Sequence, residues 1–197
     1  MNLMSYKIVA LLFFGLVSLK LEINSISAQN WSFVVKQDAN FRISVPDGKN
    51  TYRLNELDHP VFGPLKIHHY THVDTFSKKG EMVYTVFYTD YPEDLVHQDS
   101  VELLEEFFLV TAESAAYSVA GNLIYSDNVQ NFHCPGYTFR IHYNQGNAVI
   151  RSRAYLCCSQ LYIISVASSA EGVSTQNMFR FFDSFALIQD CKSVKGN

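Results

Sequence analysis

Three histidines and one tyrosine lie within the seven residues 66–72, which read KIHHYTH. Imidazole nitrogens bind Zn²⁺ and Cu²⁺, so the first question is whether these side chains form a metal site. On an extended strand His68, Tyr70 and His72 share one face, and His69 points to the other. Four residues along a strand span about 13 Å, so His68 and His72 cannot hold one ion together. We therefore predict no metal at this stretch.

A predicted hairpin gathers a second group of reactive side chains. Its strands are 136–143 and 148–157, and if Gln145 and Gly146 form the loop, opposed residues have numbers that sum to 291. One face of the hairpin is then apolar and small. The other face carries three opposed pairs with basic residues, namely Arg140 with Arg151, Thr138 with Arg153, and His142 with Val149.

Arginines that face each other directly are unfavourable unless an acidic group lies beside them. Our main interpretation is that a predicted helix supplies that group through Glu102, Glu105 and Glu106. The alternative is an anionic ligand held by the guanidinium groups. The candidate residues for such a site are Arg140, Arg151, Arg153 and His142.

The same register places Cys134 opposite Cys157, because these numbers also sum to 291. Opposed Cα atoms lie about 4.5–5.5 Å apart, within the range of a disulfide. Pro135 is expected at a non-hydrogen-bonded pair, where it costs no ladder bond. A bulge near Pro135 would pair Cys134 with Cys158 instead. We predict the disulfide Cys134–Cys157 and a second one between Cys158 and Cys191.

The N-terminus has the layout of a secretory signal peptide. Lys7 precedes an apolar run at 8–19, and a polar stretch with small residues follows. The run is shorter than the roughly 20 residues that cross a bilayer. We expect cleavage after Ala28, a secreted or periplasmic protein, and no stable membrane insertion after cleavage. Residues 1–28 are thus the signal peptide and 29–197 a single domain.

The composition narrows the class of partner. The chain has 197 residues, 48% of them hydrophobic, which is enough for one buried core. Its formal net charge of −4 offers no basic excess to hold nucleic acid. We therefore expect no nucleic-acid partner.

Hydrophobic periodicity predicts an α+β fold with an antiparallel sheet. Apolar residues at three- and four-residue spacing predict a helix, with a capping box from Asp99 and Glu102 and with Gly121 just past its end. A second helix is predicted at 174–187. Strands are predicted at 31–35, 39–45, 64–74, 81–90, 122–130, 136–143, 148–157 and 160–168.

Two stretches resemble the PsbP-like fold, which the extrinsic PsbP subunit of photosystem II shares with a Ran-binding nuclear import factor and many small exported bacterial proteins. They are FRISVPDG at 41–48 and the closing block at 151–187, which ends in an aromatic-Asp-Ser-Phe pattern at 182–185. The resemblance implies a three-layer α/β/α sandwich that acts as a non-catalytic binding or assembly module with a protein partner. No residue matches an ion or manganese site, so a photosystem role is not implied.

No motif in the sequence demands an enzyme. The sequence has no H-E-x-x-H, phosphate-binding loop or G-x-S-x-G elbow, so Asp183 and Ser184 are best interpreted as helix residues. We predict a non-enzymatic protein without a cofactor. The alternative is a small secreted hydrolase, which would place a histidine beside a carboxylate and a serine or cysteine in a cleft.

Overall fold

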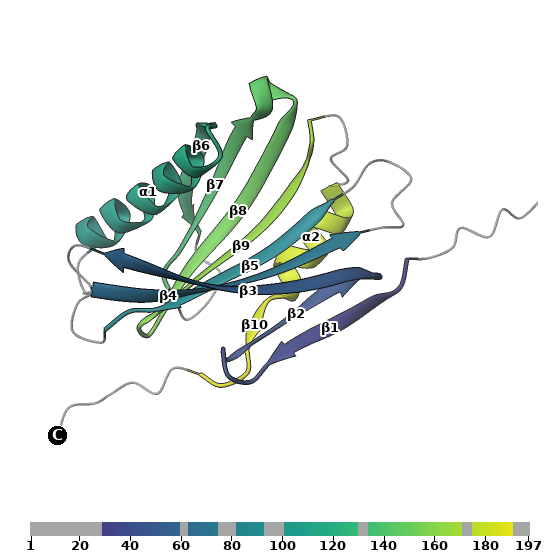
Figure 1. Ribbon diagram of the computed structural model, residues 1–197, viewed down its shortest axis with the longest axis horizontal. Coiled ribbons are helices and arrows are strands. Elements are labelled where there is room, and N and C mark those ends of the chain that lie inside the picture. Colours follow the sequence, from purple (N-terminus) through teal and green to yellow (C-terminus); the bar gives the residue numbers. More distant parts are fainter. Residues whose placement is uncertain are drawn as a thin grey trace, which may run out of the picture.

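The described part of the chain forms two antiparallel sheets and two helices (Figure 1). This computed structural model describes residues 29–59, 63–74, 82–92, 101–129, 134–170 and 175–190. The larger sheet has seven strands in the order β3-β4-β5-β9-β8-β7-β6, and the smaller has the order β1-β2-β10. The strands are β1 (Trp31–Lys36), β2 (Phe41–Pro46), β3 (Gly48–His59), β4 (Gly63–Asp74), β5 (Val83–Asp90), β6 (Asn122–Val129), β7 (Gly136–Tyr143), β8 (Ala148–Cys157), β9 (Gln160–Ser169) and β10 (Ala186–Leu187). The helices are α1 (Val101–Ser118) and α2 (Thr175–Ser184), and a 3₁₀ turn, η1 (Asn144–Gly146), joins β7 to β8.

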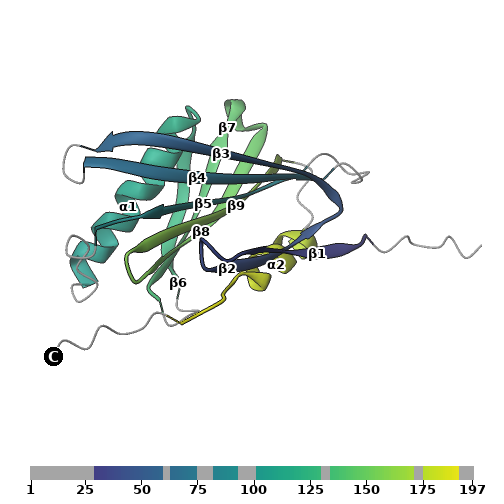
Figure 2. The same ribbon diagram turned by 60° about the horizontal axis from the view of Figure 1, so that its bottom comes forward.

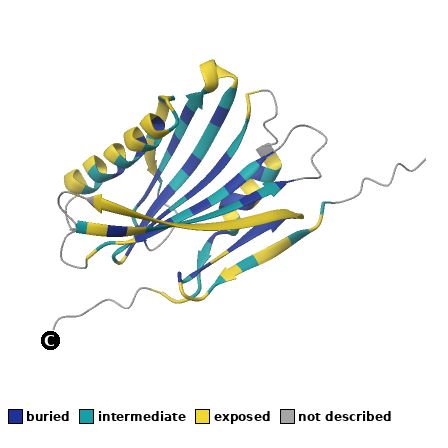
Figure 3. Ribbon diagram, viewed as in Figure 1, coloured by how far each residue is buried: buried dark blue, intermediate teal, exposed yellow. Residues whose placement is uncertain are grey.

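Helix α1 covers one face of the larger sheet. Its buried residues Phe108, Ala112 and Ala116 recur every four positions, which draws a single apolar stripe along the helix. This stripe packs on apolar side chains of β7, including Phe139 and Ile141. Figure 3 shows the buried inner side and the exposed outer side of α1.

The smaller sheet and α2 together cover the other face (Figures 1 and 2). Phe41 of β2 lies at the centre of this layer, with its ring 6.2 Å from that of Tyr162 and 6.0 Å from that of Phe185. Aromatic pairs at these distances add stabilisation beyond the apolar area that they bury. The core on this face is therefore largely aromatic.

The expected three-layer α/β/α sandwich is wrong. The fold is mostly β, and α+β describes it only loosely, because a sheet and a helix of 10 residues replace the expected second helical layer. The physical reason lies in β2, whose Phe41, Ile43 and Val45 bury their side chains on the larger sheet. Strands at the N-terminal end of the domain thus fold over the sheet. Helix α2 also ends before the predicted position, since Ala186 and Leu187 pair with β2.

The predicted strands were found close to their expected positions, and β3 was missed. β4 and β5 pair as the expected hairpin, with His68 opposite Tyr88. β3 reads GKNTYRLNELDH and lies at the edge of the larger sheet. Its described side chains are exposed (Figure 3), and only Tyr52 and Leu54 alternate with polar residues, which is too short a pattern to predict a strand of this length.

Helix α1 ends in a Schellman motif. The backbone N–H of Gly121 donates to the carbonyl of Ala116 at 2.9 Å, and that of Ala120 donates to Tyr117 at 3.0 Å. Ala120 occupies the left-handed position, with φ of 47°. Gly121 follows the helix as predicted, but for another reason, because a Cβ there would lie 2.7 Å from Cγ2 of Ile141. The predicted cap Asp99 lies outside the described residues.

Candidate anion-binding pocket

The register predicted for β7 and β8 is confirmed. Arg140 lies opposite Arg151, Thr138 opposite Arg153, and His142 opposite Val149. The strands end and begin where predicted, and η1 with Asn147 forms the connection between Tyr143 and Ala148. The sum of opposed residue numbers is unchanged, so the two arginines face each other as predicted.

The predicted disulfide between Cys134 and Cys157 is also confirmed, with Cα atoms 5.0 Å apart. The N–H of Leu156 donates to the carbonyl of Pro135 at 3.0 Å, so Pro135 and Leu156 form a hydrogen-bonded pair. Our expectation that Pro135 lies at a non-hydrogen-bonded pair was wrong. The neighbouring cysteine pair is then non-hydrogen-bonded, where opposed residues approach most closely. Cys158 is disulfide-bonded as well. Its expected partner, Cys191, lies outside the described residues.

The interpretation that α1 neutralises the arginines is wrong. The apolar stripe of α1 packs on the apolar face of the hairpin, which is the face opposite to the arginines. Glu105 instead accepts a hydrogen bond from the side chain of Asn128 at 3.1 Å. Glu102 and Glu106 are likewise exposed side chains of α1.

The arginine face borders a cavity of about 430 Å³ between β6–β8 and α2. This volume lies within the range typical of small-molecule sites. We call this cavity the arginine pocket. Its described lining residues include Arg140, Arg151 and Arg153 and no carboxylate. The others are Ile124, Tyr125, Thr138, Phe139, Ser152, Met178, Phe179 and Phe182.

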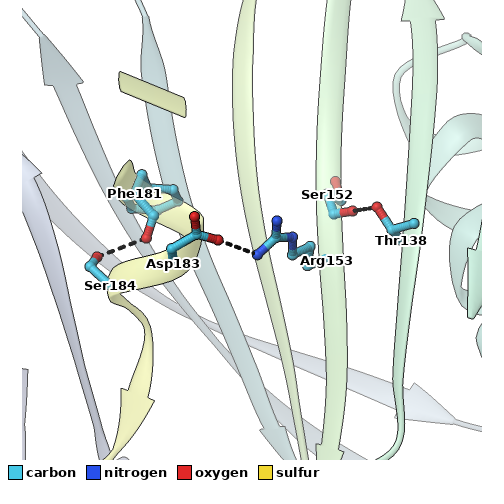
Figure 4. Close-up of polar contacts among 6 residues, drawn as sticks. All are labelled: Thr138, Ser152, Arg153, Phe181, Asp183 and Ser184. Atoms are coloured by element: carbon cyan, nitrogen blue, oxygen red, sulfur yellow. Dashed lines mark hydrogen bonds and ion pairs between the residues drawn. The ribbon is translucent and has the colours of Figure 1, made fainter. Parts of the chain in front are cut away.

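Of the three arginines, Arg153 has an acidic partner on α2. Its guanidinium donates to Asp183 at 2.9 Å and also lies over the ring of Phe182, 5.0 Å from the ring centre. Figure 4 shows this ion pair reaching from β8 to α2. Ser184 is engaged in the end of the helix, because its hydroxyl donates to the carbonyl of Phe181 at 2.7 Å and accepts from the N–H of Ser44 at 2.8 Å. Asp183 and Ser184 are thus helix residues with structural contacts.

Arg151 has a weaker partner, and Arg140 has an unsatisfied hydrogen-bond donor. Arg151 donates to the thioether sulfur of Met178 at 3.5 Å, and sulfur is a weak acceptor. Nε of Arg140 is buried without a hydrogen-bond partner among the described residues. Burial lowers the pKa of Arg151, and the charge of Arg140 lowers it further. Among the described residues neither Arg140 nor Arg151 forms an ion pair, although Asp127 of β6, opposite Thr138, lies on the same face of the sheet.

His142 belongs to the same face of β7 as Arg140 but does not line the arginine pocket. Its Nε2 is buried and has no hydrogen-bond partner in the part of the chain that the structure describes. The predicted register therefore brings the three arginines to one cavity, and His142 is not among the described residues that line it.

The apolar rim of the arginine pocket was missed from the sequence. Ile124, Tyr125 and Phe179 line the cavity and are about half exposed, at 53%, 51% and 49%. Tyr125 and Ile124 lie at a register shift in β6, between Leu123 and Tyr125. A bulge of this kind re-aims side chains, and the sequence carries no signal for it.

The histidine stretch that opened the sequence lies on β4. His68 stacks on Tyr88 with ring centres 4.1 Å apart, and His69 stacks on Phe87 at 4.0 Å. One ring nitrogen of each histidine bonds an uncharged group, which is the hydroxyl of Tyr52 for His68, that of Thr71 for His69, and the side-chain amide of Asn50 for His72. Over the ranges described here, no three His, Cys, Asp or Glu side chains gather as a metal site.

Comparison with family models and with curated proteins found no match to this chain. The resemblance to the PsbP-like fold therefore stays a prediction. The signal peptide at 1–28 lies outside the described residues, and within the parts of the chain given above no helix is long and apolar enough to span a membrane.

Proposed function

We propose that this protein is an exported, non-catalytic binding module that holds an amphipathic anion in the arginine pocket. The ligand would carry a carboxylate or phosphate group joined to an apolar body. The observation that carries the proposal is the direct opposition of Arg140 and Arg151 on the wall of a cavity whose described lining holds no carboxylate.

The energetics favour an anion at this place. Two guanidinium groups that oppose each other are destabilising unless a negative charge lies near both. A bound carboxylate or phosphate would accept charge-assisted hydrogen bonds from the guanidinium forks, including the unsatisfied Nε of Arg140. The exposed Tyr125 and Phe179 at the rim offer apolar surface to the rest of the ligand.

Two further observations support an exported protein without catalytic activity. Disulfides persist in oxidising compartments, so the bridge between Cys134 and Cys157 favours an exported protein. A hydrolase would need a histidine oriented by a carboxylate. The side-chain hydrogen bonds of His68, His69 and His72 go to uncharged groups, which favours a binding role over catalysis. The proposal also includes a protein partner, which would deliver the ligand or receive it.

The test uses naphthalene-2-carboxylate as the probe and measures binding by calorimetry and thermal unfolding. We expect the probe to bind and to raise the melting temperature of the wild type. The variant Arg140→Gln/Arg151→Gln should lose this effect. The control Arg53→Gln removes an exposed arginine from β3, at the opposite edge of the larger sheet, and should retain it. Equal binding to all three proteins, or no binding to the wild type, would contradict the proposal.

A further inference from the structure

A second cavity lies between the two sheets, away from the arginines. It encloses about 220 Å³. We call it the inter-sheet cleft. One wall comes from β1 and β2, with Val34, Ile43 and Val45, and the other from β3 and β4, with Asn50 and Thr71. The arginine pocket shares none of its lining residues, so the two cavities can be tested separately.

The two walls differ in chemistry. The side of β1 and β2 is aliphatic and aromatic, and Phe181 of α2 closes the cleft at depth. The side of β3 and β4 presents hydroxyl, amide and imidazole groups, among them Asn50, Tyr52 and His72. A cavity that is apolar on one side and polar on the other selects molecules that are themselves two-sided.

The inner end of the inter-sheet cleft holds two polar groups that are poorly satisfied. His72 and Tyr84 lie opposite each other on β4 and β5, and both are buried, at 5% and 1% exposed. Nδ1 of His72 bonds Asn50 at 2.7 Å, while Nε2 makes no hydrogen bond of good geometry among the described residues, although the backbone of Pro46 lies beside the ring. The hydroxyl of Tyr84 donates to the sulfur of Met82, a weak acceptor, and its oxygen keeps lone pairs to accept with.

Buried polar atoms without partners cost free energy, and a bound molecule is one way in which proteins satisfy them. Burial lowers the pKa of His72, although the carboxylates of Asp74 and Asp47 and the carbonyl of Pro46 oppose this shift. The imidazole is therefore favoured in its neutral form, which suits an uncharged hydrogen-bonding group.

Among the described residues no carboxylate lines the inter-sheet cleft, and its one lining lysine, Lys36, lies at Tyr70, two positions along β4 from His72. The ammonium of Lys36 lies over the ring of Tyr70, 4.6 Å from the ring centre. A ligand group directed to His72 and Tyr84 therefore meets two uncharged side chains, and burial of an unpaired charge beside them is costly.

The size of the cavity limits the ligand further. An engineered apolar cavity of about 150 Å³ binds benzene. A cavity of about 220 Å³ therefore accommodates one ring with a small substituent. We infer that the inter-sheet cleft binds an uncharged, single-ring aromatic molecule of the phenol type, with its ring between β2 and β4 and its hydroxyl directed to His72 and Tyr84.

The only tryptophan of the chain reports on this site. Trp31 lies edge-on to Tyr84, with ring centres 6.1 Å apart, so a ligand beside Tyr84 should change tryptophan emission. The test titrates 4-methylphenol into the full mature chain and follows Trp31 fluorescence together with the NMR signals of the His72 ring. We expect both to shift with one affinity, and 4-methylbenzoate to bind at least about tenfold more weakly because its charge stays unpaired.

Two variants locate the site. Val86→Phe fills the cleft at a buried lining residue and should abolish the response. His72→Phe keeps a ring of similar shape and should remove the preference for 4-methylphenol over toluene. Because Val86→Phe can fail to fold, the wild-type NMR titration decides independently. Signals of His72 and Trp31 that stay fixed up to the solubility of the probe, or equal affinity for 4-methylbenzoate, would overturn the inference. The double variant Arg140→Gln/Arg151→Gln should keep this binding, which separates it from the anion site.

Discussion

Asp183 of α2 and Arg153 of β8 are joined by an ion pair of 2.9 Å at the border of the arginine pocket. The carboxylate side chain is 60% exposed and the guanidinium side chain 17% exposed. Exposed ion pairs of this kind contribute little to stability. The pair instead occupies one of the three arginines that could hold an anion.

The first prediction concerns this competition. Asp183→Asn removes the negative charge that holds Arg153, so we expect naphthalene-2-carboxylate to bind several-fold more tightly. The free energy of unfolding should fall by less than about 1 kcal/mol. Asp190→Asn removes an exposed carboxylate after β10 and serves as the matched control. Weaker binding to Asp183→Asn, measured by calorimetry, would show that Asp183 orients Arg153 for the ligand.

The second prediction concerns the end of α1, where Ala120 rather than a glycine occupies the left-handed position and Gly121 follows it. A non-glycine residue in the left-handed region costs roughly 1–2 kcal/mol. Ala120→Gly should therefore raise the free energy of unfolding by about 0.5–1 kcal/mol. Gly121→Ala should lower it, because the new Cβ would meet Ile141 and the carbonyl of His142. Urea denaturation measures both, and destabilisation by Ala120→Gly would refute the assignment of the motif.

The third prediction concerns the disulfide. Cys134 and Cys157 are separated by 23 positions, and closing a loop of this length stabilises the fold by roughly 3 kcal/mol in the chain-entropy model. The variant Cys134→Ala/Cys157→Ala should lose about this amount in urea denaturation. Mass spectrometry of non-reduced peptides should find the wild-type crosslink. Free thiols at both positions in protein purified without a reductant would contradict it.

The fourth prediction concerns pH. Burial lowers the pKa of both His69 and His72 from the ordinary value of 6.5, and Arg53 lowers that of His69 further. The unfolded chain then binds more protons than the folded one as the pH falls through about 6.5, so stability is present above this pH and is lost below it. We expect the urea midpoint to fall between about pH 7.5 and about pH 5.5. The variant His69→Gln/His72→Gln should show a flatter profile, and an identical slope would argue against this assignment.

The sequence predicted the hairpin β7–β8 in detail because two constraints agreed. A single loop position set the register, and the same register brought Cys134 to Cys157. Period-two alternation also marked one face of this hairpin as apolar, and that face is the one α1 covers. Hydrophobic alternation and the strand register were therefore sufficient to place Arg140, Arg151 and Arg153 together.

What the sequence did not reveal depends on packing between distant segments. The strand β3 is exposed and has only Tyr52 and Leu54 in apolar alternation, so its pairing with β4 leaves little periodic signal. Arg153 forms an ion pair with Asp183, which lies 30 positions away on another element, so no local sequence pattern connects the two residues. The glutamates of α1 were assigned to the wrong face, although its stripe at Phe108, Ala112 and Ala116 requires an apolar surface beneath it. The inter-sheet cleft arises only when β1 and β2 fold over the larger sheet.

The hairpin β7–β8 is joined by the main chain at one end and by Cys134–Cys157 at the other, so it forms a closed covalent ring. The turn at 144–147 is exposed, and exposed turns are where proteases cut. A cut there would leave the two halves of the protein linked through sulfur, with Arg140 and Arg151 still held by the ladder between them. An exported protein built in this way could survive nicking by extracellular proteases with its arginine wall intact. The same turn is a natural place to open new termini in a circularly permuted chain.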